Sequence, residues 1–295
     1  MVVRRLARAT DDGYESELVP GIRASADAAL LADELAFASA RLDELREGPP
    51  ALLGDAAALG HDGRREEALW LVAQIAAIGP RERWQDGDEA AFAAVAASAV
   101  PWAGGELPDV ASDLCGPRAC ADVATTLAAY RAWASRAGGQ AAGLAGEATW
   151  SPQRRFDRAF ERLALPGFVR GARYEFLLLA GALGLVEMRP ASLHLLTDPR
   201  DPVLAAAKRV FGFGDPIVLA RRASELADAT GLPIGALDLA LLNWARLADA
   251  PGAERIAAGS RATVDDEMRA LVADALGLSE PDHPRAAAPG RDMHA

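Results

Sequence analysis

A glycine-bearing turn, Leu165-Pro166-Gly167-Phe168-Val169-Arg170-Gly171-Ala172-Arg173, separates two segments of helical pattern in this chain of 295 residues. The first segment opens at Ser151-Pro152, which combines an N-cap residue with proline at the first helical position, and it reaches Leu163. Glycine lets the backbone N–H groups of such a turn approach a phosphate closely, with the N-terminus of the second helix behind them. The pattern therefore predicts a helix, a hairpin and a second helix that together offer an anion-binding turn.

Short breaks separate further segments of helical pattern along most of the chain. We expect helices over residues of about 22–47, 64–78, 88–98, 119–137, 202–212, 216 onward, 233–247 and 263–276. Aromatic residues make up only 6% of the chain, and neither a βαβ alternation nor a repeat of fixed period is present. The sequence predicts an all-α fold.

Breaks rich in glycine and proline predict how the chain is divided. The best boundary is Gly138-Gly139 through Gly146, a small-residue segment. We therefore expect an N-terminal segment over 1–21, an N-terminal helical layer over 22–145 and a second helical region over 146–278. Residues 279–295 are rich in Pro, Ala and charge, and we expect a disordered tail there.

Residue usage argues against several kinds of site. Cys115 and Cys120 are too few for a disulfide framework or an iron–sulfur cluster, and the four histidines show no zinc spacing. We therefore expect no metal and no other cofactor. No apolar stretch follows the basic N-terminus, and the longest apolar run, Phe176 to Val186, is too short to cross a bilayer. We expect a soluble, cytoplasmic protein with no membrane partner, and its oligomeric state is open.

Charge is distributed unevenly along the chain. The overall net charge is −11, which by itself argues against a general nucleic-acid binder. Residues Trp150 to Arg222 nevertheless hold 12 basic and 7 acidic side chains, a local net charge of +5, and they include the hairpin. A coding bias toward arginine on helix surfaces would also give this excess. A basic patch is needed to neutralise DNA phosphates, so we expect DNA as a partner.

The Leu165-Pro166-Gly167 turn resembles the hairpin of the helix–hairpin–helix DNA glycosylases. In that superfamily an aspartate follows the hairpin and precedes a small hydrophobic helix that ends in glycine, and Asp201 to Gly212 matches this interval. The usual second glycine of the hairpin is Val169 here, and the interval from Gly167 to Asp201 is longer than in most members. These departures leave Asp198 as a rival for the catalytic acid.

Other segments are similar to the glycosylase-like group named α-glutamyl/putrescinyl-thymine pyrophosphorylases. They are Gly48-Pro49-Pro50, Ala68-Leu69-Trp70, Gln74-Ile75-Ala76, Arg155-Phe156-Asp157-Arg158, Ala206-Ala207-Lys208-Arg209-Val210-Phe211-Gly212, Leu237-Asp238 and Asn243-Trp244. This resemblance covers most of residues 40–250. It implies a helix–hairpin–helix glycosylase-like fold with an added N-terminal helical layer, and a substrate in phage DNA that carries bulky modified pyrimidines.

The chemistry of base excision needs a carboxylate beside the sugar. Cleavage of an N-glycosidic bond builds positive charge on the deoxyribose, and a carboxylate stabilises that charge and orients or deprotonates the attacking water. Asp201 is our first choice for this role and Asp198 the second. Asp before Pro is also an ordinary helix N-cap, and Asp215-Pro216 repeats the device. Bifunctional members of the superfamily carry a hairpin lysine where this chain has Gly171, which predicts a monofunctional enzyme without β-lyase activity.

Candidate binding residues follow from the need to hold DNA and a flipped base. For stacking and polar contacts to the base we select Trp150, Phe156, Tyr174, Trp244, Asn243 and Gln74. For phosphate contacts we select Gly167, Val169, Gly171, Arg170, Arg173, Arg154, Arg155, Lys208 and Arg209. Core packing for the first set and a solvated surface for the second are the competing interpretations. Glu161, Glu175 and Glu187 are expected to pair with arginines at helical spacing.

The predicted function is a monofunctional DNA glycosylase that excises a modified base, such as glucosylated hydroxymethylcytosine in phage DNA, in antiviral defence. One alternative is a pyrophosphorylase-like enzyme that modifies the base, although the chain has no Walker-type Gly-Lys-Ser/Thr loop to bind a nucleotide. The other alternative is a non-catalytic DNA-binding or sensor module.

Overall fold

The computed structural model describes residues 11–79, 102, 104–105, 107, 115–116, 118–250 and 252–278. Regular secondary structure in this part of the chain is helical throughout, with no strand, which confirms the predicted all-α fold. The predicted helix over 88–98, the N-terminal residues 1–10 and the predicted tail over 279–295 lie outside the described residues.

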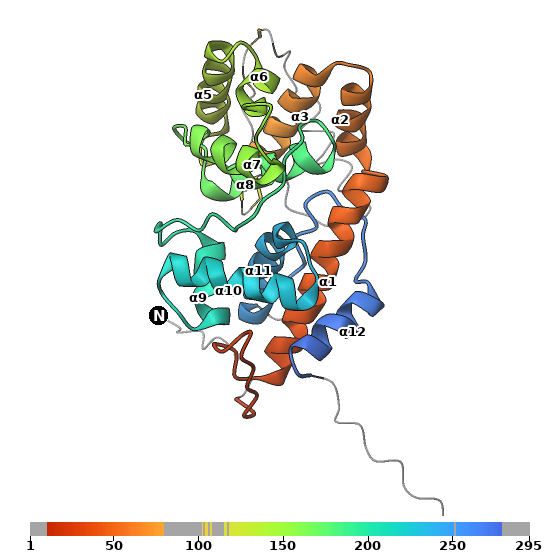
Figure 1. The fold of residues 1–295 in the computed structure, drawn as a ribbon, viewed down its shortest axis with the longest axis vertical. Helices are drawn as coiled ribbons and strands as arrows, with labels where there is room; N and C mark the ends of the chain where they lie inside the picture. Colours follow the sequence, from red (N-terminus) through yellow and green to blue (C-terminus); the bar gives the residue numbers. More distant parts are fainter. Residues whose placement is uncertain are drawn as a thin grey trace, which may run out of the picture.

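The helices form two halves that meet beside one long helix (Figure 1). The long helix, α1, spans Ser25–Glu47. The hairpin half comprises α2 (Ala51–His61), α3 (Arg65–Ile78), α5 (Val123–Arg136), α6 (Gln140–Ala145), α7 (Pro152–Arg162) and α8 (Arg170–Ala182). The α9 half comprises α9 (Pro202–Phe211), α10 (Pro216–Thr230), α11 (Ile234–Asp249) and α12 (Asp266–Ala275).

Helices that are distant in the sequence pack against each other across these halves. The α1 helix lies against α11 and α12 and also touches α8, while α3 lies against α8. The α1 contacts bury Leu31, Leu35 and Leu42 in a hydrophobic core that continues through both halves. Burial of this apolar surface, more than helix propensity, fixes the arrangement.

The predicted start signals of three helices are confirmed. Oγ of Ser151 accepts a hydrogen bond from the backbone N–H of Arg154, and the carboxylates of Asp201 and Asp215 each accept from the first turn of their helix. Each side chain satisfies a backbone donor that has no partner within the helix, which is why these positions begin α7, α9 and α10.

Two helices were not predicted, α2 and α6. The α6 helix lies inside the glycine-rich segment that we expected to form a flexible boundary. It is fixed by Gln140, whose amide donates to the backbone carbonyl of Glu66 at 2.6 Å and accepts from the hydroxyl of Tyr130 at 2.9 Å. The α2 helix contains Gly60, where a Cβ would lie 2.3 Å from the side chain of Leu185, so glycine here permits close packing despite its low helix propensity.

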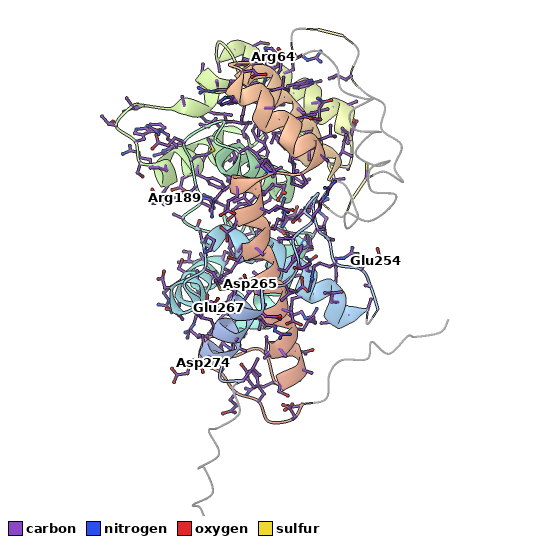
Figure 2. All side chains as sticks on the ribbon, turned by 90° about the vertical axis from the view of Figure 1, so that its right-hand side faces the viewer. Arg64, Arg189, Glu254, Asp265, Glu267 and Asp274 are labelled. Carbon is purple, nitrogen blue, oxygen red and sulfur yellow. The ribbon has the colours of Figure 1, made fainter. Side chains whose placement is uncertain are left out.

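Charged side chains such as Arg64, Glu254 and Glu267 project from the outside of the molecule (Figure 2). No helix in the described residues is both long and apolar enough to span a membrane. Within the same residues, no cluster of three or more His, Cys, Asp or Glu is arranged to hold a metal ion.

Candidate active site

The hairpin between α7 and α8 is built around Gly167. Its φ of +78° lies in the left-handed region that favours glycine, and a Cβ at this position would approach Oγ1 of Thr126 in α5 to 2.4 Å. Gly167 thus allows both the turn and its close contact with α5. The α8 helix that follows has Val169 as its N-cap, with no side-chain hydrogen bond to its first turn.

Asp201 is the N-cap of α9, as the Asp-Pro pattern predicted. Its Oδ1 atom accepts hydrogen bonds from the backbone N–H groups of Val203 at 2.9 Å and Leu204 at 3.4 Å. Asp215 makes the same contacts at the start of α10, yet Asp215 is exposed whereas only 8% of Asp201 is accessible to solvent. The two aspartates share one capping device in two different environments.

A cavity of about 410 Å³ brings Asp201 and the hairpin together. The described residues that line it are Arg118, Ala119, Phe168, Val169, Arg170, Gly171, Arg173, Leu196, Asp198, Arg200, Asp201, Pro202 and Val203. Its size is in the range of small-molecule sites. Both candidate acids and four of the predicted phosphate-binding residues therefore share one cavity.

Only one oxygen of the Asp201 carboxylate accepts hydrogen bonds from the described residues. Its Oδ2 atom is buried and has no hydrogen-bond partner among the described residues, and the nearest cation, Nε of Arg170, lies 3.5 Å away. Burial raises the pKa of the Asp201 carboxyl above its ordinary value, Arg170 opposes that rise, and the negative charge of Asp238 adds to it. An underpaired buried carboxylate of this kind is typical of functional sites.

Asp198 lies in a different environment at the edge of the same cavity. Its side chain is 43% exposed and forms an ion pair with Arg200 at 3.1 Å. Hydrogen bonds from Arg200 lower the pKa of the Asp198 carboxyl. Asp198 is thus partly exposed and paired, whereas Asp201 is buried and underpaired.

Behind the cavity lies a chain of buried ion pairs that the sequence did not predict. Asp238 in α11 contacts both Arg170 and Arg118, Arg118 also binds Glu175 at 2.9 Å, and Glu175 contacts Arg41 in α1. All five side chains are less than a tenth exposed. Charges are costly to bury unless they are paired, so the five residues form one unit, which we call the buried ion-pair chain.

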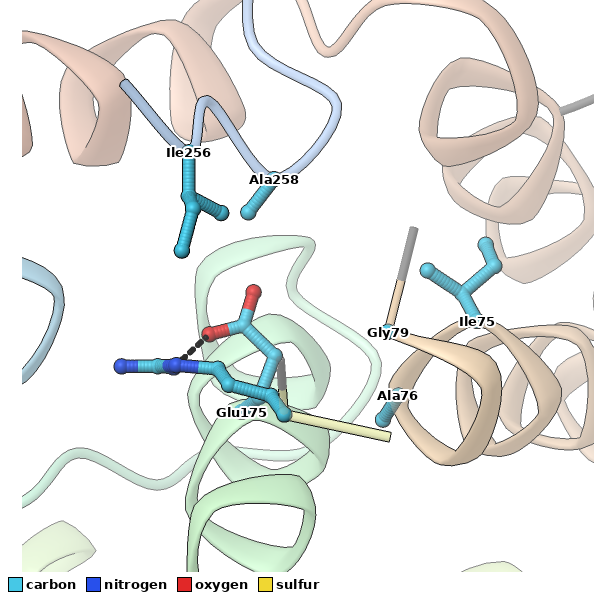
Figure 3. A pocket seen from close by; sticks show the side chains of 7 residues that line it. Ile75, Ala76, Gly79, Glu175, Ile256 and Ala258 are labelled. Carbon is cyan, nitrogen blue, oxygen red and sulfur yellow. Dashed lines mark hydrogen bonds and ion pairs between the residues drawn. The ribbon is translucent and has the colours of Figure 1, made fainter. Parts of the chain in front are cut away.

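Glu175 shows how this unit connects the two halves. It faces Ile256 and Ala258 across a small cavity of about 20 Å³ (Figure 3). Glu175 was expected to pair at helical spacing, and its partners are instead Arg118 and Arg41, distant in the sequence. Glu161 does pair at helical spacing, with Arg158, whereas Glu187 binds Arg155 of α7 from the segment after α8.

The residues predicted to contact the base are found elsewhere in the fold. The side-chain amide of Asn243 donates to the backbone carbonyl of Ile256 and accepts from its backbone N–H. The indole N–H of Trp244 donates to the carbonyl of Asp27, and the hydroxyl of Tyr174 donates to the carbonyl of Ser192. The other three are Phe156, which packs edge-to-face against Tyr174, Gln74, which is buried in α3, and Trp150, which lies beside Arg154. None of the six residues is in the described lining of the Asp201 cavity.

The predicted phosphate contacts separate into three places. Val169, Arg170, Gly171 and Arg173 line the cavity. Gly167 forms the turn against Thr126, and Arg154 and Arg155 lie on α7; none of these three is in the described cavity lining. Lys208 and Arg209 lie at the opposite end of α9 from Asp201.

Arg173 is the unusual cation of the cavity wall. Its guanidinium donates to the carbonyl of Phe160 at 3.2 Å, its Nε atom has no partner, and it forms no ion pair with a carboxylate of the described residues. Burial, with the positive charge of Arg170 nearby, lowers the pKa of the Arg173 guanidinium. The guanidinium also lies 4.4 Å from the centre of the Phe160 ring, so Arg173 is held by backbone and aromatic contacts without a carboxylate partner among the described residues.

Comparison with known proteins gives one finding that overlaps this site. No curated protein and no solved structure matches the chain. Residues 113–232 match the family model described as alpha-glutamyl/putrescinyl thymine pyrophosphorylase clade 3. The match takes in Arg118, the hairpin and Asp201, and it ends before Asp238. In this part, less than half of the 295 residues, the chain is similar to a family named for modified thymine.

Proposed function

We propose that this protein is a monofunctional DNA glycosylase that excises a modified base and leaves an abasic site. The observation that carries the proposal is the carboxylate of Asp201, buried and underpaired in a cavity that it shares with the α7–α8 hairpin. The family match supports a role connected with modified DNA bases.

Asp201 supplies the electrostatic part of the reaction. As the C–N bond breaks, the deoxyribose develops oxocarbenium character, and the ionised carboxylate stabilises that charge and orients or deprotonates the attacking water. The backbone N–H groups of Val203 and Leu204 hold Oδ1, which leaves Oδ2 for this chemistry. The Asp201 carboxylate can stabilise the sugar in this way without a cofactor.

The hairpin supplies the contact to the DNA backbone. The first turn of α8 presents N–H groups that no N-cap side chain satisfies, and Arg173 places its guanidinium one turn later. A helix N-terminus and a guanidinium without a carboxylate partner both favour a phosphate. This arrangement would hold a phosphate next to the flipped nucleotide, with its sugar at Asp201.

The position of the single lysine supports a monofunctional reaction without a lyase step. The bifunctional enzymes that the hairpin resembles form a Schiff base with the sugar through a hairpin lysine, and this chain has Gly171 at that position. Lys208 is the only lysine of the sequence, and it lies exposed at the far end of α9. The enzyme therefore leaves an intact abasic strand.

The substrate is a pyrimidine enlarged by modification, in phage DNA, and the reaction serves antiviral defence. The family description names glutamyl- and putrescinyl-thymine, and glucosylated hydroxymethylcytosine is another bulky pyrimidine of phage DNA. A cavity of about 410 Å³ accommodates a base together with a substituent.

The test is incubation of the full chain with matched DNAs, either unmodified or carrying hydroxymethylcytosine, glucosylated hydroxymethylcytosine, α-glutamylthymine or putrescinylthymine. We expect alkali-dependent strand breaks on at least one modified DNA, and the intact modified base should appear as the released product in the mass spectrum. A change in the mass of the base without its release would replace the proposal with the pyrophosphorylase-like alternative, which the family description favours. Salt-sensitive binding with no turnover on any DNA would replace it with the sensor alternative.

A further inference from the structure

Asp238 lies between Arg170 and Arg118 in the buried ion-pair chain. It lies in α11, is fully buried, and contacts two guanidinium groups at once, that of Arg170 from α8 and that of Arg118 from the segment before α5. The rest of the buried surface of α11 is almost wholly apolar. A buried carboxylate in such a helix is stable only when cations face it, so burial of the Asp238 charge depends on Arg170 and Arg118.

Arg170 is shared between two carboxylates. It contacts Oδ1 of Asp238 and donates to the backbone carbonyls of Leu193 and His194, and it reaches Oδ2 of Asp201 only through Nε, at 3.5 Å. Close arginine–carboxylate hydrogen bonds are shorter, about 2.7–2.9 Å. Asp238 therefore has the closer ion pair with this guanidinium and Asp201 the more distant one, and neither pair is a hydrogen bond.

We propose that Asp238 is a positioning residue of the Asp201 site, which holds the Arg170 guanidinium so that Oδ2 of Asp201 stays free of a close ion pair. This inference rests on the proposed catalytic role of Asp201. Without Asp238, Arg170 would turn to its remaining carboxylate and occupy the oxygen that the reaction needs. With Asp238 in place, Arg170 still offsets part of the cost of burying the Asp201 charge.

The charges around Asp201 allow this role to be separated from a purely structural one. Facing Asp201 are Arg170 from α8, Asp238 from α11 and Arg118 from the segment before α5; Arg173 lines the same cavity, and Asp198 and Arg200 pair with each other on the segment that leads to α9. Removal of the Asp238 charge takes away a repulsion and lets Arg170 approach. Both effects lower the pKa of the Asp201 carboxyl.

The test compares Asp238→Asn with the wild-type chain by ¹³C NMR titration of aspartate carboxyl groups, with the Asp201 signal assigned from Asp201→Asn. We expect the pKa of Asp201 to fall in Asp238→Asn. The matched control is Glu175→Gln, which removes another buried carboxylate of the same unit that contacts Arg118 and Arg41 but not Arg170. It should move the pKa of Asp201 less. An unchanged pKa in a folded Asp238→Asn, or equal shifts in the two variants, would overturn the proposal.

Turnover gives a second readout on a DNA that the wild-type enzyme cleaves. In Asp238→Asn we expect kcat to fall about tenfold or more with KM unchanged, and the acid limb of the pH profile to move to lower pH. If Asp238→Asn does not fold, the same change is made in an Arg118→Gln background and compared with Arg118→Gln alone, so that the loss of the Arg118 charge, which also faces Asp201, is common to both proteins. A shifted Asp201 pKa with no excision of any base would reject the proposed function and keep the electrostatic role of Asp238.

Discussion

Asp201 and Asp215 show at the scale of single residues why a capping motif alone does not identify a site. Both precede proline and both cap a helix through the same backbone contacts, and only their surroundings differ. Sequence patterns predict the cap because it depends on neighbouring residues. Burial depends on α8 and α11, which pack against Asp201 from elsewhere in the chain, so it could not be predicted.

The stability of two asparagine variants should reflect this difference. Asn caps a helix about as well as Asp, so Asp215→Asn should change the free energy of unfolding by less than about 0.5 kcal/mol. Asp201→Asn removes a buried carboxylate whose raised pKa shows that the folded state disfavours its charge, so at pH 7 it should leave stability unchanged or raise it by up to about 1 kcal/mol. Urea denaturation measures both. A loss above about 1 kcal/mol in Asp201→Asn alone would mean that the charge stabilises the fold.

The rate of excision should depend on pH through the same carboxyl group. The proposed reaction uses ionised Asp201, and burial raises the pKa of that carboxyl, so the rate should fall on acidification at a pH above the ordinary value for aspartate. Single-turnover rates across the acidic range provide the measurement, with circular dichroism to confirm that the fold persists. An acid limb at or below the ordinary aspartate value would contradict the assignment.

At the scale of secondary structure, the sequence predicted helices best where a local signal marks their start. Ser151, Asp201 and Asp215 each begin a helix as expected. The α2 and α6 helices lack such signals and contain glycines, and contacts with distant residues stabilise them instead, such as those of Gln140 with Glu66. Local propensity could not reveal these contacts.

The hairpin gives a prediction at this scale. Gly167→Ala should destabilise the protein more than Gly184→Ala, because both sites have φ near +70° to +80° but only Gly167 would also place a Cβ against Thr126. We expect a loss of about 1 kcal/mol for Gly184→Ala from the backbone conformation and a clearly larger one for Gly167→Ala. Thermal and urea unfolding measure both. Equal losses would show that the α5 contact adjusts without cost.

At the scale of the whole molecule, the site lies where the two halves meet. Arg41 of α1, Glu175 of α8 and Asp238 of α11 bring charges from distant parts of the chain into one buried unit behind the cavity. The hairpin and Asp201 could be predicted because each depends on a short motif. Arg118 and Asp238 are 120 residues apart in the sequence, and a pairing over that distance leaves no local pattern.

The chain has a net charge of −11, so DNA binding should depend on a few cations such as Arg173, and the salt dependence of affinity tests this. If Arg173 holds a phosphate, Arg173→Gln should weaken binding to all DNA sequences and reduce the slope of log K against log salt by about 1. Arg64→Gln is the control, because Arg64 is exposed and already paired with Glu67. Fluorescence anisotropy at several salt concentrations gives the slopes. The same slope in Arg173→Gln and wild type would remove Arg173 from the DNA contact.

The most direct test of the account is single-turnover excision by Asp201→Asn beside Asp215→Asn, on a modified DNA that the wild-type protein cleaves. Asparagine keeps the cap and the shape of the side chain and removes the charge that, in the proposed reaction, stabilises the sugar. We expect Asp201→Asn to lose at least about 10²-fold in rate while its DNA affinity is kept, and Asp215→Asn to match the wild type. Full excision by Asp201→Asn would contradict the account and transfer the test to Asp198.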